Sequence, residues 1–153
     1  MDEQAFKHEV LTAFEYSYKH DDWVNPLDEA LAGVTAEEAA WRPGPKGKGI
    51  WDIVLHLAVW NENIVERMKT GEASRPAEGA WPEPSPTRNE AAWQAAQQRL
   101  WDSLAALHAY IETNPLDSLK GHYGLGDLFC RFIHNGYHIG QITKMRELRG
   151  MTS

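Results

Sequence analysis

The sequence predicts an all-α fold, a four-helix bundle with a long connection between the second and third helices. Four segments repeat apolar residues at the three- and four-residue spacing of an amphipathic helix, and no segment reads convincingly as a strand. Helices without strands bury their apolar stripes most economically against one another. The 153 residues, 42% apolar and 24% charged, fit a single globular domain, which we expect to span residues 1–153.

The first helix is expected from Gln4 to Leu31. Its apolar stripe includes Phe6, Val10, Phe14, Leu27 and Leu31. Pro26 lacks an amide donor and clashes with the preceding turn, so we expect a kink or a junction of two helices between Asp22 and Pro26. Gly33 is the expected C-terminal cap.

A short helical turn and three further helices follow. Thr35 and Glu38 have the spacing of a capping box, which predicts one helical turn. Residues 42–49 form a loop rich in glycine and proline, which lacks the spacing and the preceding strand of a phosphate-binding loop. The helices are expected at 50–70, 87–113 and 127–149. The connection 72–86 holds four prolines and one aromatic residue, Trp81.

Composition excludes several classes of partner and location. The net charge of −7 is a poor match to a phosphate backbone, so we expect no nucleic-acid partner. No run approaches about 18 apolar residues, and the acidic N-terminus has no apolar signal segment, so neither a membrane span nor secretion is expected. Cys130 is the only cysteine, which excludes an intramolecular disulfide and favours the reducing cytoplasm.

Three histidines fall inside apolar helical segments. His134 and His138 lie four residues apart on one helix, so their side chains share a face with Cβ atoms about 5–6 Å apart. The glutamate of the H-E-x-x-H protease motif is missing between them, so a metalloprotease is not indicated. His56 lies midway along another apolar helix, and a bundle can bring it beside the pair. Three neutral imidazoles would form an open site for a divalent transition metal. The alternative is that these are core histidines satisfied by hydrogen bonds.

The remaining polar candidates are expected to be structural. We expect His8, His20, His108 and His122 at the surface. His20, beside two aspartates, is an alternative ligand or base at one end of the bundle. Cys130 and Gln141 lie one turn from the histidine pair and could line a pocket, but core packing is favoured for Cys130 and a backbone or interhelix hydrogen bond for Gln141. The seven tryptophans are expected to pack in the core.

These motifs resemble those of one known family. The run from His134 to Ile142, followed by Arg146, resembles the last-helix signature of the DinB/YfiT-like proteins. Residues 41–43 and 50–57, with Trp60, are similar to that family's second-helix region, and Trp23, Pro26, Leu27 and Leu31 to the end of its first helix. The resemblance covers nearly the whole chain, and its sharpest parts are His56 and the His134/His138 pair in the expected order.

The resemblance implies a four-helix bundle in which His56, His134 and His138 bind a divalent metal, commonly nickel or zinc. It also implies a homodimer. Some relatives use the metal to activate a low-molecular-weight thiol for transfer or isomerisation, and others are described as hydrolases. Our leading hypothesis is therefore a cytoplasmic metal-dependent enzyme, a thiol-dependent transferase or a hydrolase, acting on an unknown small molecule. No catalytic base can be named. The alternative is a non-catalytic metal-binding or dimerising interaction module.

Overall fold

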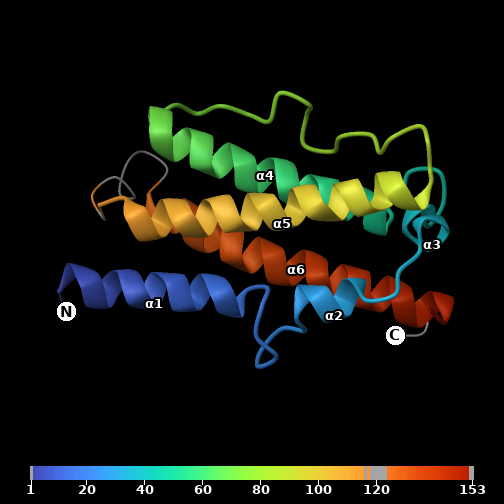
Figure 1. Ribbon diagram of the computed structural model, residues 1–153, viewed down its shortest axis with the longest axis horizontal. Helices are drawn as coiled ribbons and strands as arrows, with labels where there is room; N and C mark the ends of the chain where they lie inside the picture. Colours follow the sequence, from blue (N-terminus) through green and yellow to red (C-terminus); the bar gives the residue numbers. More distant parts are fainter. Residues whose placement is uncertain (1, 116, 118–123, 152–153) are drawn as a thin grey trace.

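The computed structural model describes residues 2–115, 117 and 124–151, and these form helices with no strand beyond one isolated bridge between Asp21 and Val24. The helices are α1 (Glu3–Tyr16), α2 (Leu27–Leu31), α3 (Ala36–Ala40), α4 (Ile50–Thr70), α5 (Glu90–Thr113) and α6 (Leu125–Arg149). Figure 1 shows α4, α5 and α6 as three long rods, with α1 and α2 following one another along one edge. The all-α bundle is therefore confirmed, and α1 and α2 together occupy its fourth position.

The first helix is shorter than the sequence predicted. A kinked helix over 4–31 is wrong, and the alternative of two helices is correct, although α1 already ends at Tyr16 and residues 17–26 form a loop before α2. The Ser17 hydroxyl donates to the Phe14 carbonyl, and the Leu27 amide closes the loop on the Tyr18 carbonyl at 2.8 Å. The chain thus leaves the helix well before Pro26, and the proline only fixes the entry to α2.

Other boundaries follow local capping. The capping box of Thr35 and Glu38 begins α3 as predicted. The Asn89 side chain accepts from the Ala92 amide at 2.9 Å, so α5 begins three residues after the expected Thr87. The last helix begins at Leu125, slightly before the expected Asp127.

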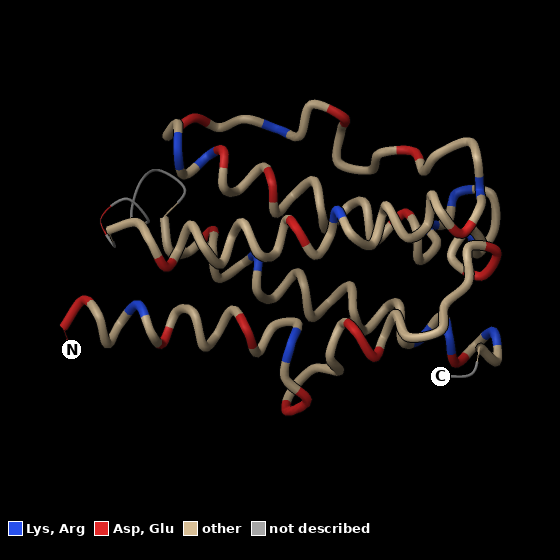
Figure 2. Tube along the Cα trace, viewed as in Figure 1, with Lys and Arg blue, Asp and Glu red and all other residues tan. Residues whose placement is uncertain are grey.

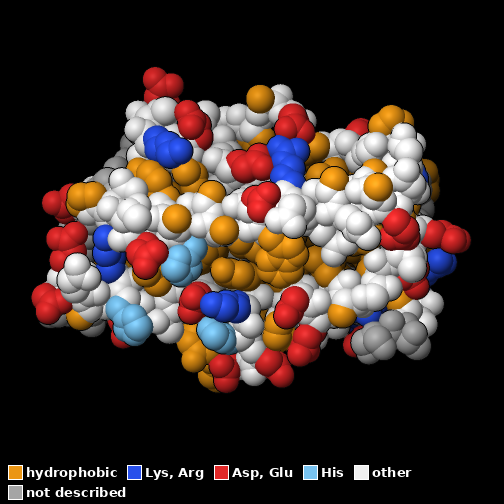
Figure 3. Space-filling view, viewed as in Figure 1, with side chains coloured by type: hydrophobic (Ala, Val, Ile, Leu, Met, Phe, Trp, Pro, Cys, Tyr) orange, Lys and Arg blue, Asp and Glu red, His pale blue; other side chains and the backbone are white. Residues whose placement is uncertain are grey.

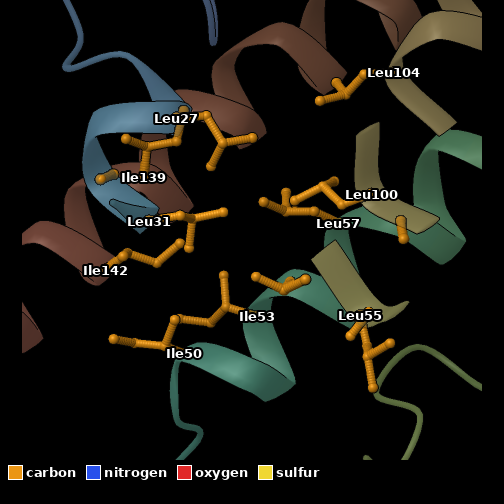
Figure 4. Packing of buried hydrophobic residues seen from close by; sticks show 14 of the residues in the cluster. Leu27, Leu31, Ile50, Ile53, Leu55, Leu57, Leu100, Leu104, Ile139 and Ile142 are labelled. Atoms are coloured by element: carbon orange, nitrogen blue, oxygen red, sulfur yellow. The ribbon is translucent and has the colours of Figure 1, made fainter. Parts of the chain in front are cut away.

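The core lies where α2, α4, α5 and α6 meet. In Figure 4, Leu27 and Leu31 of α2 point toward Ile139 and Ile142 of α6. Trp51 and Trp93 are both 1% exposed and pack with ring centroids 5.3 Å apart, and the Trp93 indole donates to the Val34 carbonyl. The prediction that all tryptophans pack in the core is nevertheless wrong for Trp23, which is 92% exposed in the α1–α2 loop.

Helix α6 does not bury its apolar residues evenly. The sequence predicted a heavily buried first half, but Phe129, Ile133 and Tyr137 are 39%, 73% and 61% exposed. Arg131 and Asn135 are buried instead, because each finds a polar partner inside the bundle, Asn61 and Ser17 respectively. The inward face of α6 is therefore partly polar.

The connection between α4 and α5, residues 72–89, is called the strap here. It runs along α4 in Figure 1, and Figure 2 shows acidic residues distributed along it. Three arginines hold it in place: Arg42 pairs with Glu83, Arg99 with Glu78, and Arg67 donates to the Ser74 carbonyl. These contacts fix the middle of the strap above the centre of α4.

On the face shown in Figure 3, basic side chains are scattered singly among acidic ones. None of the helices in the described part of the chain is both long enough and apolar enough to span a membrane.

Candidate metal centre

The three predicted histidines lie together inside the bundle. His56 comes from the middle of α4, and His134 and His138 come from successive turns of α6. The Nε2 atom of His134 lies 3.0 Å from Nε2 of His56 and 3.0 Å from Nε2 of His138. His56 and His138 are 6% and 4% exposed. The spacing of four residues on α6 and the packing of α4 against α6 are thus enough to bring three ring nitrogens together.

The opposite ring nitrogens fix the protonation of two rings. Nδ1 of His56 donates to the Ala80 carbonyl of the strap, which can only accept. Nδ1 of His138 donates to Oε1 of Gln141 at 2.6 Å, and the Gln141 amide donates to the Tyr137 hydroxyl at 3.0 Å. In the neutral rings, Nε2 of His56 and of His138 therefore carries a lone pair directed toward His134.

Without a cation, one of the two Nε2 lone pairs that face His134 has no hydrogen-bond donor. Neutral His134 carries at most one proton on Nε2, so it can satisfy only one of the two lone pairs facing it. Zinc–imidazole bonds of about 2.0–2.1 Å at a tetrahedral angle would place the nitrogens about 3.3–3.4 Å apart, close to the 3.0 Å separations found here. The three residues therefore fit a divalent ion, and two of them already have the hydrogen-bonded Nδ1–H typical of metal-binding histidines.

Electrostatics keep the rings ready to bind a cation. Burial lowers the pKa of His134 to about 3 and that of His138 to about 4, and the positive charge of Arg131 adds to both shifts. Burial also lowers the pKa of His56. All three imidazoles are therefore neutral at physiological pH, which is the form that binds metal.

A cavity of 670 Å³, called the tryptophan cavity here, opens onto the three rings. It is lined by Pro43, Lys48, Ile53, His56, Trp81, His134, Tyr137, His138, Gln141, Lys144, Met145 and Leu148. The Trp81 indole stacks on His56 with centroids 3.8 Å apart and planes inclined by 14°, and Lys48 Nζ lies 5.3 Å from the Trp81 ring. The wall is mainly apolar, with two lysines, which suits a small molecule of mixed character.

The other predicted residues fall outside the cluster. His8 is exposed, while His20 and His108 are half-buried beside Glu15, so neither is a ligand at this site. His122 lies outside the described residues. Core packing of Cys130 is wrong, because its side chain is exposed.

Gln141 and three further residues have roles that the sequence did not assign. Gln141 lines the tryptophan cavity, which was the alternative prediction for it, and its hydrogen bond lies within α6 rather than to another helix or the backbone. Ala80 and Trp81 of the strap and Arg131 of α6 were missed. Trp81 had a signal, as the one aromatic residue in a proline-rich connection, and Arg131 lies one turn before His134.

Comparisons with known proteins agree with this geometry. A family model described as the DinB superfamily matches residues 25–142, most of the chain, including all three cluster histidines. No curated protein and no solved structure matches significantly. With its helical bundle, its convergent histidines and this match, the chain belongs to the DinB superfamily.

Proposed function

We propose that this protein is a metal-dependent enzyme acting on a small molecule, of the thiol-dependent transferase or hydrolase type. His56, His134 and His138 would hold the metal, nickel or zinc. The observation that carries the proposal is the tryptophan cavity, because the three ring nitrogens open onto 670 Å³ of space. A structural metal site is normally closed by a fourth protein ligand, whereas a catalytic site keeps an open position.

The chain's own residues would orient the ligands and shape the cavity. Ala80 and Gln141 hold two imidazoles in the tautomer that directs Nε2 inward. Trp81 covers one face of His56 and limits its exposure to water. Lys48 and Lys144 give the cavity positive charge for a substrate with an anionic group.

The thiol-dependent reading has support in the lining of the tryptophan cavity. Among the described residues, no aspartate or glutamate lines this cavity, so none of its lining residues offers a carboxylate as a general base. A divalent ion at the three histidines would act as a Lewis acid and could deprotonate a coordinating thiol without a protein base. Water is the other available nucleophile, which keeps hydrolysis open.

Elemental analysis of the purified protein and of three His→Ala variants tests the metal site. We expect near-stoichiometric nickel or zinc in the wild type and in His108→Ala, a half-buried histidine outside the cluster. Loss should be steepest in His134→Ala and His138→Ala, whose shared helix fixes their geometry. Unchanged metal content in all three cluster variants would refute the assignment.

A screen of metal-loaded protein against small electrophiles and esters, with and without cellular thiols, tests catalysis. Activity should require metal and disappear on chelation. The competing proposal is a non-catalytic metal-binding module. It predicts that chelation lowers the melting temperature markedly while no thiol transfer or hydrolysis is found across the panel.

We also propose a homodimer formed through α6 and the α1–α2 loop. Ile133, Tyr137 and Trp23 are large apolar side chains exposed by 61% or more, and Trp23 lines one shallow hollow with Gly136 and Gly140 of α6. Sedimentation should give a dimer for the wild type and a monomer for Ile133→Glu. A monomeric wild type at about 100 µM, a concentration well above the Kd of a stable dimer, would exclude the dimer.

We place the protein in the reducing cytoplasm, where Cys130 remains a free thiol.

A further inference from the structure

A second cavity lies against the histidine cluster and is not used by the proposed function. This arginine cavity, of 390 Å³, meets the tryptophan cavity at His56 and His134. It is lined by His56, Trp60, Asn63, Ile64, Arg67, Ala80, Asp127, Cys130, Arg131 and His134. The cavity therefore adjoins the candidate metal centre while having a different chemical character.

Buried polar atoms without a partner gather around the arginine cavity. Among the described residues, four such side-chain atoms occur, and three belong to residues lining it: Asn63 Oδ1, Arg131 Nε and His134 Nδ1. Buried polar groups in native proteins are normally hydrogen-bonded, so a cluster of exceptions indicates a polar ligand or ordered water.

Arg131 is a buried cation that contacts no carboxylate in the part of the chain that the structure describes. It is 7% exposed, and the hydrogen bond found for its guanidinium runs from Nη2 to Asn61 Oδ1 at a long 3.4 Å. The nearby carboxylate of Asp127 pairs with Arg67 instead, at 3.5 Å. Burial lowers the pKa of Arg131 to about 10, so it stays protonated at neutral pH. An unpaired buried charge is costly, and an anion would offset that cost.

His134 lacks the acceptor that the other two histidines have. Nδ1 of His56 donates to Ala80 and Nδ1 of His138 donates to Gln141, but no described residue accepts from Nδ1 of His134. When Nε2 binds a metal, Nδ1 carries the proton and becomes a donor. His134 and Arg131 both line the arginine cavity, and their unpartnered atoms lie buried beside it.

We infer that the arginine cavity binds the oxyanion group of a small acid, a carboxylate or a phosphate. Arg131 and the Nδ1–H of His134 donate to its oxygens, and because Arg67 pairs with Asp127 at the same wall, the charge that the anion offsets is that of Arg131. The inference rests on the proposed function, because the metal fixes the His134 tautomer, and it deepens that function by placing an anionic group of the substrate in this second cavity. The anion then supplies the missing hydrogen-bond acceptor of the third histidine.

NMR titration of the zinc-loaded, full-length protein tests the site. The probes are acetate and inorganic phosphate, with acetamide as the neutral isostere of acetate. We expect at least one anion to shift the indole N–H of Trp60 and one arginine Nε–H, whereas acetamide shifts neither. The stronger of the two anions identifies the group, carboxylate or phosphate.

Two arginine variants separate a built site from general attraction. Arg131→Met should weaken anion binding by about 10- to 100-fold, the range for hydrogen bonds to a charged group. Arg149→Met removes the same charge from an exposed position on α6 and should stay within twofold of wild type. If Arg131→Met does not fold, Arg131→Lys replaces it, and weakened binding is again expected because lysine cannot donate in the bidentate manner.

Three results would overturn the inference: no shift at Trp60 with either anion, equal binding of acetamide, or equal affinities of the Arg131 and Arg149 variants. The first means that ordered water satisfies the cavity. An anion held only at the metal would shift the indole N–H of Trp81 and bind to Arg131→Met as it binds to the wild type. The Arg131 and Arg149 variants would then have equal affinities. Zinc content is measured in every sample, so failure of anion binding in zinc-loaded protein refutes this inference alone. Loss of zinc binding refutes the proposed function.

Discussion

Replacing Gln141 with leucine should weaken metal binding without disturbing the bundle. Its Oε1 accepts from Nδ1 of His138 at 2.6 Å, and its side chain is half-buried at the cavity wall. Loss of such an acceptor typically weakens metal affinity by about 10- to 100-fold, which corresponds to about 1.4–2.7 kcal/mol. The short, partly buried hydrogen bond places the expected effect in this range, because leucine leaves the Nδ1–H without an acceptor of equal quality.

The orientation of the Gln141 amide gives a second, smaller prediction. Its Nε2 donates to the Tyr137 hydroxyl at 3.0 Å, and this contact keeps Oε1 turned toward His138. Tyr137→Phe should therefore weaken metal affinity by only about threefold, or about 0.7 kcal/mol, because the bond is partly exposed and of ordinary strength.

Competition titration with a zinc chelator at pH 7.5 measures both effects. Gln98→Leu is the matched control, because Gln98 also makes a local hydrogen bond, to Asp102, on an exposed face of α5. It should bind zinc as the wild type does. If Gln141→Leu and Gln98→Leu gave the same affinity within twofold, Gln141 would not orient the ligand and the reasoning would be wrong.

Three further predictions concern stability. Gly49→Ala should destabilise the fold by about 2–4 kcal/mol in urea melts, because a Cβ there would lie 2.1 Å from the Trp41 carbonyl oxygen in the loop before α4. The control Gly126→Ala should be neutral or stabilising, because a Cβ at Gly126 would meet no atom within 4 Å. Arg146→Met should cost about 2–4 kcal/mol in the same assay, because its guanidinium donates three 2.8 Å hydrogen bonds to the carbonyls of Glu29, Ala30 and Ala32 at the C-terminal end of α2. An unchanged midpoint would show that water replaces these bonds. The metal-free protein should lose stability as pH falls from about 6.5 to about 4. Between these values the unfolded histidines bind protons that His134 and His138, with pKa values lowered to about 3 and 4, do not. After discounting for partial solvent screening, we expect this contribution to the free energy of unfolding to be about 2–4 kcal/mol and to be fully present above pH 6.5. The dependence of stability on pH should be flatter in His134→Gln.

The histidine cluster could be anticipated because most of its geometry is local. A spacing of four residues on a helix brings His134 and His138 together whatever the rest of the bundle does. His56 needed one further condition, that α4 and α6 be neighbours at that level, and a short bundle offers few other arrangements. The all-α class followed in the same way from apolar periodicity.

The details that failed depend on longer-range competition. The apolar stripe extends to residue 17 and resumes at Leu27, and hydrogen bonds of Ser17 and Leu27 favour a loop between them. In α6, apolar residues on several sides gave no unique buried face. The inward face is decided by Asn61 and Ser17, polar partners on distant segments, and periodicity carries no information about them.

The position of the strap over the site could not be predicted for a related reason. Its acidic residues Glu78 and Glu83 look like ordinary surface charges in the sequence, yet they pair with Arg99 and Arg42 on other segments. Exposed ion pairs of this kind contribute little individually to stability. Their consequence is positional, because they hold the strap where its carbonyl accepts from His56.

His134 is the ring that this scaffold leaves incomplete. The strap supplies an acceptor for His56, and α6 itself supplies one for His138, so both rings are oriented before any ligand arrives. Among the described residues His134 has neither, and it lines the cavity that Arg131 also lines. A ligand anion there would fix the third ring and raise its basicity toward the metal. Metal affinity and anion affinity should therefore be coupled, each strengthening the other by the same factor. Measuring zinc affinity with and without the bound anion tests this reciprocity, and equal zinc affinities would show that the two sites are independent.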